Sequence, residues 1–327
     1  MAIKYFNIAE YEQKFKPTSI FIGARRIGKT FSAFSYIYER PPFLYARNTE
    51  VELDECCTLF GNPFKKWNKV LGKDLHMKKE KKHALILEET GDNEHVVGYG
   101  AALSLLGSMR GVDLSDIKVG LLDEFIEKKR LTFDQAKNYD DLYETINGNR
   151  ELEGEPPFIF LLLSNAQKLD NSILASKNLI TPIEGLIRSG QKSFSTKDCL
   201  VVLPESEVSD LKKSTAFYQG MEGTKTYQEA IENKFANDSF YGIVKRPLKE
   251  YIGVCVIDGI YIYKHKSNGK YYACHTQCSN IPTFTSKDNF ALFYRAYGHK
   301  FDIMAATGQL EYADFTTKSG LNNILRI

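Results

Sequence analysis

A glycine-rich segment near the start of the chain constrains the fold more than any other stretch. The apolar residues 19–22 precede it and predict a strand, while residues 31–39 contain no Gly or Pro and predict a helix. A strand, a tight loop and a helix in this order are the context of the phosphate-binding motif G-x-x-x-x-G-K-T of NTPases. The motif residues are Gly23, Ala24, Arg25, Arg26, Ile27, Gly28, Lys29 and Thr30.

Each part of this motif has its own task in binding a nucleotide. The glycines let backbone N–H groups turn toward phosphate oxygens, and the N-terminus of the following helix adds its positive end. We expect the Lys29 amine to reach the β- and γ-phosphates, and the Thr30 hydroxyl to hold Mg²⁺. The alternative is a glycine turn with a solvated lysine.

A second stretch pairs an apolar run with two acids. Residues 117–122 predict a buried parallel strand, and Asp123 and Glu124 follow at the end that faces the ligand crevice. Asp123 is placed to hold Mg²⁺, and Glu124 to orient and polarise the attacking water. Such a pair is common alone, but after a phosphate loop it indicates an ATPase with an extra strand between the two motifs. A Ras-like GTPase would need an N-K-x-D motif, which the sequence lacks, so we expect ATP.

Further strands and helices are predicted around these two motifs. The apolar residues 158–163 run into Asn165, whose side chain would lie beside the γ-phosphate and sense hydrolysis; an ordinary strand-end turn is the alternative. Residues 43–47 and 199–203 predict strands, and residues 50–60 a helix. Residues 65–82 hold eight lysines around the single tryptophan and predict a solvated helix face and loop, or else a positive rim for a polyanion.

Length and composition predict a two-domain globular protein. At 327 residues with a net charge of +2, the chain is not basic overall, so any contact with nucleic acid must be local. The N-terminus has no signal-peptide core, and no run of 18 apolar residues occurs, so we expect a cytoplasmic protein without a membrane segment. We expect an α/β domain over residues 1–204, a polar helical linker over 205–238, and a small α+β domain over 239–327 with hairpin turns at Asp258-Gly259 and Asn268-Gly269.

Four segments together resemble one family; they read GARRIGKT, LLDEFIEKKR, NGNRE and LLLSNA. In this order and at these distances the chain resembles the DNA-packaging (encapsidation) ATPases of small, protein-primed short-tailed bacteriophages of the picovirus type, which are related to large terminases. The resemblance implies an ASCE P-loop ATPase domain with a mainly parallel sheet, a linker, and a C-terminal domain of ribonuclease-H-like fold. It also implies a homopentameric ring at the portal, or connector, of a procapsid in the bacterial host, where ATP hydrolysis drives double-stranded DNA inward.

The resemblance extends to single residues. Lys29 and Thr30 match the family's phosphate-loop pair, Asp123 and Glu124 its Walker B pair, and Asn165 its coupling position.

Two arginines match positions that act across subunits in the family. Arg150 lies in the segment that bears a trans-acting arginine, but here Asn147 and Gly148 precede it in place of the family's preceding arginine. Arg110 lies where the family has a basic residue also proposed to reach the neighbouring subunit. Such an arginine would stabilise charge on the transferring phosphoryl group. An intrasubunit salt bridge is the alternative for both.

Two further expectations concern DNA. Lys128, Lys129 and Arg130 follow the Walker B strand in a predicted loop and would contact the phosphate backbone, unless they form a solvated patch. The acids of the C-terminal domain are scattered outside its strands, whereas a two-metal nuclease needs them clustered, so we expect no nuclease and instead docking to the portal or procapsid and contact with DNA. These acids are Asp258, Asp288, Asp302, Glu311 and Asp314.

Three alternative functions stay open on the sequence alone. The first is a helicase-like or other nucleic-acid-dependent P-loop ATPase, the second a P-loop kinase of small molecules, and the third a portal-docking protein whose nucleotide site only switches conformation. The sequence also leaves open the ring stoichiometry, the identity of the trans-acting arginine, the need for a structural RNA, the oligomeric state in isolation, and residual nuclease activity.

Overall fold

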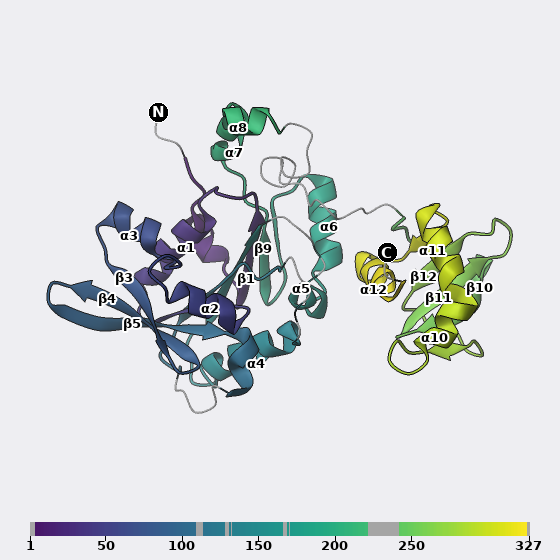
Figure 1. Cartoon of the computed structure of the whole chain (residues 1–327), viewed down its shortest axis with the longest axis horizontal. Helices are drawn as coiled ribbons and strands as arrows, with labels where there is room; N and C mark the ends of the chain where they lie inside the picture. Colours follow the sequence, from purple (N-terminus) through teal and green to yellow (C-terminus); the bar gives the residue numbers. More distant parts are fainter. Residues whose placement is uncertain are drawn as a thin grey trace. The chain divides into compact units, whose positions relative to one another are not determined.

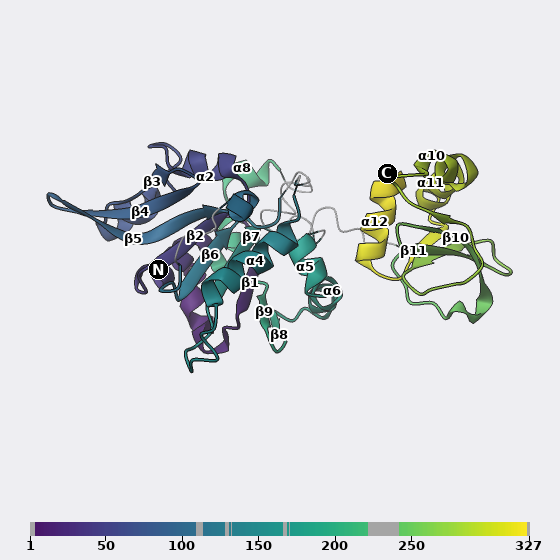
Figure 2. The ribbon, with the colours of Figure 1, turned by 90° about the horizontal axis from the view of Figure 1, so that it is seen from below.

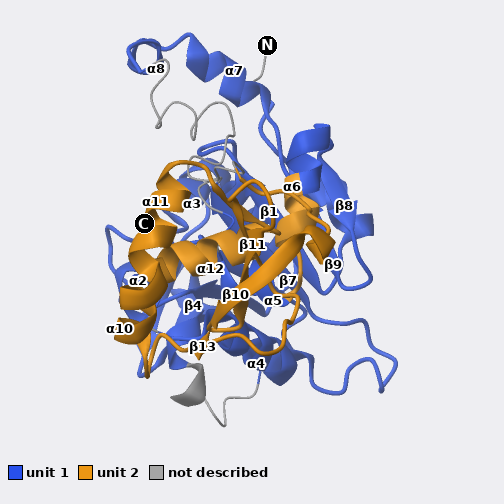
Figure 3. Cartoon of the chain, turned by 90° about the vertical axis from the view of Figure 1, so that its right-hand side faces the viewer, with its two compact units in different colours: residues 1–176, 185–237 blue, residues 177–184, 238–327 orange. Residues whose placement is uncertain are grey.

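The computed structural model describes residues 4–108, 114–127, 131, 133–165, 169, 171–221 and 242–325. The chain divides into two compact units, one of residues 1–176 and 185–237 and the other of residues 177–184 and 238–327 (Figures 1 and 3). The domain limits at residues 204 and 239 expected from the sequence stay predictions. Among the described helices, none is both long and apolar enough to span a membrane.

The first unit is built on a nine-stranded sheet of order β3-β4-β5-β2-β6-β7-β1-β9-β8. From β5 to β9 the neighbouring strands run parallel, and β3, β4 and β8 are antiparallel additions. The expected α/β class with a mainly parallel sheet is therefore confirmed. The strands are β1 (Thr18–Gly23), β2 (Phe43–Arg47), β3 (Leu75–Glu80), β4 (His83–Thr90), β5 (Asn93–Ala102), β6 (Val119–Asp123), β7 (Ile159–Asn165), β8 (Ser193–Ser195) and β9 (Cys199–Val202).

Strand order places the two motifs on separate strands with one strand between them. The phosphate loop follows β1, the acid pair ends β6, and β7 pairs with both. This confirms the extra strand predicted from the adjacent acids. Because β1, β6 and β7 are parallel, their carboxyl ends, which carry the loop, the acids and Asn165, lie at one edge of the sheet.

Helices cover both faces of this sheet (Figure 2). On one face Phe34 of α1 packs in a core with Phe21 and Leu161. On the other face Tyr139 of α4 stacks on Phe160 with ring centroids 5.3 Å apart. The described helices before residue 222 are the 3-10 helices η1 (Ile8–Lys14) and η2 (Leu103–Ser108), and α1 (Lys29–Tyr38), α2 (Glu50–Cys56), α3 (Lys65–Leu71), α4 (Gln135–Asn147), α5 (Ser172–Ser176), α6 (Ile180–Ser189), α7 (Glu207–Lys213) and α8 (Ala216–Gln219).

Two predicted elements differ from the structure. The helix expected over residues 50–60 ends at Cys56, and the chain then folds back so closely that a Cβ on Gly61 would lie 2.0 Å from the Glu55 carbonyl oxygen. The lysine-rich residues 65–82 form α3 and then β3, not a helix and a loop. In β3 the buried Leu75 and Met77 alternate with polar residues, a period-2 pattern that the many lysines obscured.

The second unit holds a five-stranded sheet of order β13-β10-β11-β12-β14. Asp258 and Gly259 have φ of 46° and 78°, which suits the tight turn between β10 and β11. Phe293 and Phe301 pack over the sheet with Ile262, so an α+β unit is confirmed. Its elements are η3 (Leu248–Glu250), β10 (Tyr251–Ile257), β11 (Ile260–His265), β12 (Tyr271–Cys274), β13 (Thr283–Phe284), α10 (Phe290–Phe293), η4 (Tyr294–Gly298), α11 (His299–Ala306), β14 (Leu310–Tyr312) and α12 (Phe315–Leu325).

Candidate nucleotide site

The phosphate loop joins β1 to α1 as the motif requires. Arg26 and Gly28 have φ of 62° and 105°, the left-handed backbone that turns the loop before α1 begins. A Cβ on Gly23 would lie 2.8 Å from Cγ of Pro204, so the packing at the end of β1 leaves no room for a side chain. Residues 23–30 therefore form a compact loop whose shape depends on both glycines.

Lys29 lies buried beneath this loop. Its amine donates hydrogen bonds to the carbonyl oxygens of Gly23 and Ala24, at 2.9 and 2.7 Å, and to Oδ1 of Asn165 at 3.4 Å. Burial lowers the pKa of Lys29 to about 8, against the opposing effect of Asp123. The structure thus brings together the predicted lysine and the predicted coupling residue from β7.

Thr30 and Asp123 face each other across the crevice. The Thr30 hydroxyl donates to Oδ1 of Asp123 at 3.4 Å. Burial raises the pKa of Asp123 to about 6, although Arg47 opposes the shift. A hydroxyl and a carboxylate at this spacing are oxygen ligands of the kind that Mg²⁺ prefers, and a divalent cation would relieve the cost of the buried carboxylate. These two residues fit the predicted metal site.

Glu124 is held by an arginine that the sequence did not single out. Its backbone has a φ of 55°, and Nη2 of Arg47, at the end of β2, lies 3.1 Å from its Oε2. The same Arg47 nitrogen is 2.8 Å from Glu52. Because β2 pairs with β6, Arg47 ends beside the acid pair. A charged residue at the end of a predicted strand was the only signal that could have identified it.

A buried network of carboxamides fixes the turn after Glu124. Nδ2 of Asn48 donates to the Glu124 carbonyl oxygen at 3.0 Å, and Nε2 of Gln135 donates to Oδ1 of Asn48 and to the Phe125 carbonyl oxygen, both at 2.6 Å. Nδ2 of Asn171 donates to Oε1 of Gln135 at 2.8 Å. The network joins the residue after β2, helix α4 and the segment before α5 to the turn after Glu124, and sequence reasoning missed it.

A cavity of about 1120 Å³ lies over the loop. Lys29, Thr30, Asp123, Glu124 and Asn165 line it, so the predicted nucleotide-binding and hydrolytic residues share one space large enough for a nucleotide. Other lining residues are Tyr5, Phe6, Arg25, Arg26, Gly28, Phe31, Lys66, Val70, Ser164, Val208, Leu211, Lys212 and Thr215.

Of the remaining predicted residues, the structure describes only Arg150, which does not line this cavity. Arg150 is buried, and its guanidinium donates to the carbonyl oxygens of Ser115 and Ile117, the latter at 3.0 Å, and pairs with Glu155 at 3.3 Å. These contacts match the intrasubunit alternative, and a trans-acting role for Arg150 stays a prediction. Arg110 and the basic group Lys128, Lys129 and Arg130 lie outside the described residues.

The acids of the second unit each contact a different group. Glu311 is buried and accepts from Arg246 and Lys270. The others accept hydrogen bonds from neighbouring backbone or hydroxyl groups, namely Asp258 from Ser286, Asp288 from Thr285, Asp302 from Tyr294 and Asp314 from Thr317. The expected lack of nuclease activity stays a prediction.

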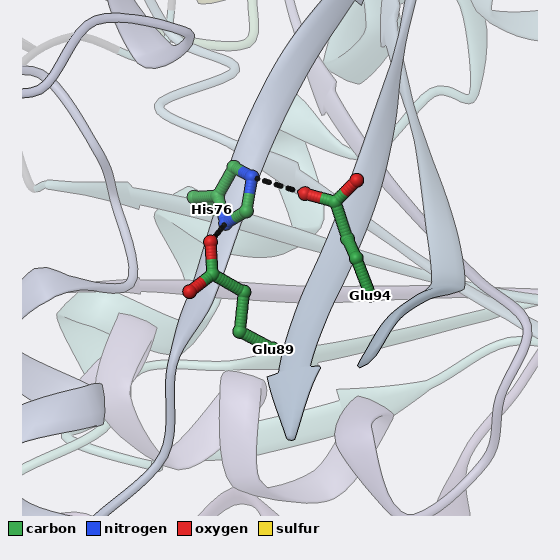
Figure 4. Close-up of side chains that lie close together, drawn as sticks. All are labelled: His76, Glu89 and Glu94. Carbon is green, nitrogen blue, oxygen red and sulfur yellow. Dashed lines mark ion pairs between the residues drawn. The ribbon is translucent and has the colours of Figure 1, made fainter. Parts of the chain in front are cut away.

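A histidine and two acids gather on the sheet formed by β3, β4 and β5 (Figure 4). Nε2 of His76 lies 3.1 Å from Glu94 and Nδ1 lies 3.8 Å from Glu89. The two carboxylates therefore approach opposite nitrogens of one ring, whereas a metal ion would need one ring nitrogen and both carboxylates to point at a common centre. We interpret this group as a cross-strand ion-pair cluster.

Comparison with known proteins gives matches along most of the chain. The model of a family described as podovirus DNA encapsidation protein (Gp16) matches residues 3–274. A DNA packaging protein of Bacillus phage PZA is 24% identical over 247 residues, or 69% of this chain. The matched region spans 64% of that relative's length, which is less than two thirds.

Two solved structures share the fold. The Phi-28 gp11 DNA packaging motor has a TM-score of 0.63 at 18% identity, with 100% of this chain and 99% of that chain covered. The bacteriophage Phi-29 viral genome packaging motor assembly has a TM-score of 0.66 at 18% identity, with 98% of each chain covered. At such identities the likeness shows the fold.

Proposed function

We infer the function from family and site together: the chain belongs to the podovirus DNA encapsidation protein (Gp16) family, and its phosphate loop and Glu124 line one cavity. We propose that it hydrolyses ATP and uses the energy to move double-stranded viral DNA into a procapsid. The observation that carries the proposal is the convergence of Lys29, Thr30, Asp123, Glu124 and Asn165 on one cavity. A kinase or a passive structural protein has no comparable support.

The geometry suggests how the residues divide the work. The Lys29 amine donates to two loop carbonyl oxygens in this structure. It would exchange these hydrogen bonds for charged hydrogen bonds to the β- and γ-phosphates. Glu124 would orient a water for in-line attack and accept its proton. Thr30 and Asp123 would hold Mg²⁺, which neutralises charge on the phosphate oxygens. Asn165, already within 3.4 Å of Lys29, would report loss of the γ-phosphate.

The assembly follows from the relatives by analogy. The solved structures that share the fold are described as DNA packaging motors, one of them as a viral genome packaging motor assembly. We propose that this chain likewise forms a homo-oligomeric ring. The family resemblance implies that the ring is a pentamer. The ring would act at the portal of a procapsid in the host cytoplasm, and the need for a structural RNA stays open.

The second unit and the basic group have proposed roles within this ring. We propose that the second unit, with the ribonuclease-H-like fold that the resemblance implies, docks to the portal or procapsid and contacts DNA. Lys128, Lys129 and Arg130 would contact the DNA backbone in the pore, without reading its sequence. Arg110 or Arg150 would stabilise charge in the neighbouring subunit's site.

ATP turnover by the purified chain, with and without double-stranded DNA, tests the proposal. We expect turnover that DNA stimulates. Lys29→Ala should lose both binding and turnover, while Glu124→Gln should bind ATP without hydrolysing it, because the phosphate contacts survive. Full turnover by Glu124→Gln would remove Glu124 from the mechanism. ATP binding without any turnover in the wild type would instead indicate a nucleotide-dependent docking protein.

A further inference from the structure

Helix α7, which follows β9 in the sequence, lies against the nucleotide cavity. Val208, Leu211 and Lys212 of this helix line the cavity together with Tyr5 of the N-terminal segment. The start of α7 is fixed there, because Ser206 caps the helix through the Val208 N–H and also donates its hydroxyl to the Lys4 carbonyl oxygen at 3.0 Å.

The N-terminal segment is in turn bound to the phosphate loop. The Phe6 N–H donates to the carbonyl oxygen of Ile27 at 3.0 Å, and the Tyr5 side chain lies so close to Gly28 that a Cβ there would be 3.1 Å from Cβ of Tyr5. The loop, the N-terminal segment and α7 therefore form three connected walls of one cavity. The position of α7 beside the loop does not depend on a single contact.

Lys212 brings a second amine to the loop. Its Nζ donates to the Arg25 carbonyl oxygen, and no described carboxylate pairs with it. Burial lowers the pKa of Lys212, and the charge of Arg26 lowers it further. Burial also lowers the pKa of Lys29, with a smaller contribution in the same direction from Lys212. Lys29 and Lys212 both line the cavity, and two amines that face one cavity make it a site for an anion.

The cavity is also lined by apolar side chains. Tyr5, Val70 and Leu211 are large apolar side chains that stay 48%, 60% and 48% exposed, and all three line this cavity. A base with flat apolar faces would bury part of each of them. The cavity thus offers amines for phosphates and apolar side chains for a base, and α7 contributes Lys212 to the first group and Leu211 to the second.

We propose that α7 is part of the nucleotide site, with Lys212 binding a phosphate of the nucleotide and Leu211 lying against its base. This inference rests on the proposed function, since it takes the cavity to bind ATP. The Lys212 amine would exchange the Arg25 carbonyl oxygen for a phosphate oxygen, as we propose for Lys29. The placement of α7 would then depend on the nucleotide bound.

The test is calorimetric titration of the full chain with ATP and Mg²⁺ in a Glu124→Gln background, where ATP should persist. Lys212→Met should weaken ATP binding roughly tenfold and flatten the dependence of affinity on salt, because a charged hydrogen bond is removed. Lys212→Arg should retain most of the affinity. Leu211→Ala should weaken binding roughly fivefold with an unchanged salt dependence, because the side chain that it truncates is apolar.

Lys213→Met is the matched control, since Lys213 lies next in the same helix but pairs with Asp210 at 2.6 Å and does not line this cavity. It should bind ATP like the parent. Unchanged affinity and salt dependence in Lys212→Met, or an equal loss in Lys213→Met, would overturn the inference. Lys212→Gln, which keeps a donor for the Arg25 carbonyl, replaces Lys212→Met if that variant does not fold. If the Glu124→Gln parent binds no ATP, the proposed function itself is overturned. If the parent binds ATP and Lys212→Met binds it equally well, only the role of α7 is rejected.

Discussion

Arg47 holds the carboxylate of Glu124, with 3.1 Å between Nη2 and Oε2, at the end of the strand next to the acid pair. This ion pair turns the Glu124 carboxylate toward the guanidinium, so the carboxylate is less free to orient a water. Glu52 competes for the same arginine nitrogen at 2.8 Å. In the proposed mechanism, Arg47 would therefore restrain hydrolysis, and Glu52 would weaken that restraint by pairing with Arg47.

We predict that Arg47→Gln raises ATP turnover in the absence of DNA. An ion pair at a half-exposed carboxylate contributes up to about 1 kcal/mol, so the expected increase is roughly two- to fivefold. Glu52→Gln should act in the opposite direction, because Arg47 would then pair with Glu124 alone, while glutamine still satisfies the cap of α2. Steady-state turnover at saturating ATP measures both. Equal loss of activity in the two variants would show that Arg47 supports hydrolysis instead of restraining it.

Arg150 gives a prediction that separates its two interpretations. Its guanidinium donates to two backbone carbonyls ahead of β6, so Arg150→Ala should destabilise the first unit by about 2 kcal/mol or more. Glu155→Gln, which removes only an exposed partner, should cost less than about 1 kcal/mol. Urea unfolding followed by Trp67 fluorescence reports on this unit. An Arg150→Ala chain of normal stability and ATP affinity that hydrolyses ATP poorly in the assembled ring would instead support the trans-acting role.

Sequence and structure agree on the site residues that directly follow a predicted strand. The loop at Gly23, the acids at Asp123 and the amide at Asn165 each follow an apolar run, and parallel pairing brings their ends together. The encapsidation resemblance, which rests on the same segments, is confirmed by the family model. Arg47 was missed because its role depends on β2 lying beside β6, which no local pattern encodes. The burial of Arg150 was missed for the same reason, since its acceptors lie in a distant segment.

The basic group Lys128, Lys129 and Arg130, outside the described residues, carries a prediction from the sequence alone. Replacing all three with alanine should weaken DNA binding and reduce the salt slope by about 0.9 for each DNA phosphate that is no longer neutralised, while DNA-independent ATPase persists. The triple variant of Lys78, Lys81 and Lys82, exposed residues of the other basic segment, is the matched control. Binding measured across a salt series decides between them. A change only in the control would assign the DNA contact to the segment around β3.

Glu311 in the second unit should make stability depend on pH. Burial raises the pKa of this carboxyl, but hydrogen bonds and charge from Arg246 and Lys270 outweigh burial, and the net pKa lies below its usual range. Because the pKa of Glu311 is lower in the folded than in the unfolded protein, its charged form stabilises the fold. This stabilisation is fully present above the unfolded pKa of about 4.3 and is lost as the pH falls through the folded pKa.

Glu311→Gln should therefore destabilise the second unit by about 2 kcal/mol near pH 7. The difference from wild type should shrink at pH values below about 4, where the wild-type carboxyl also becomes neutral. Hydrogen exchange in β12 and β14, compared with wild type at each pH so that intrinsic rates cancel, measures the effect. Glu250→Gln is the control, because Glu250 is exposed and its ion pair among the described residues is with His265, at 3.5 Å. A difference of the same size at neutral pH and well below about pH 4 would mean that the stabilisation comes from the shape of the side chain and not from its charge.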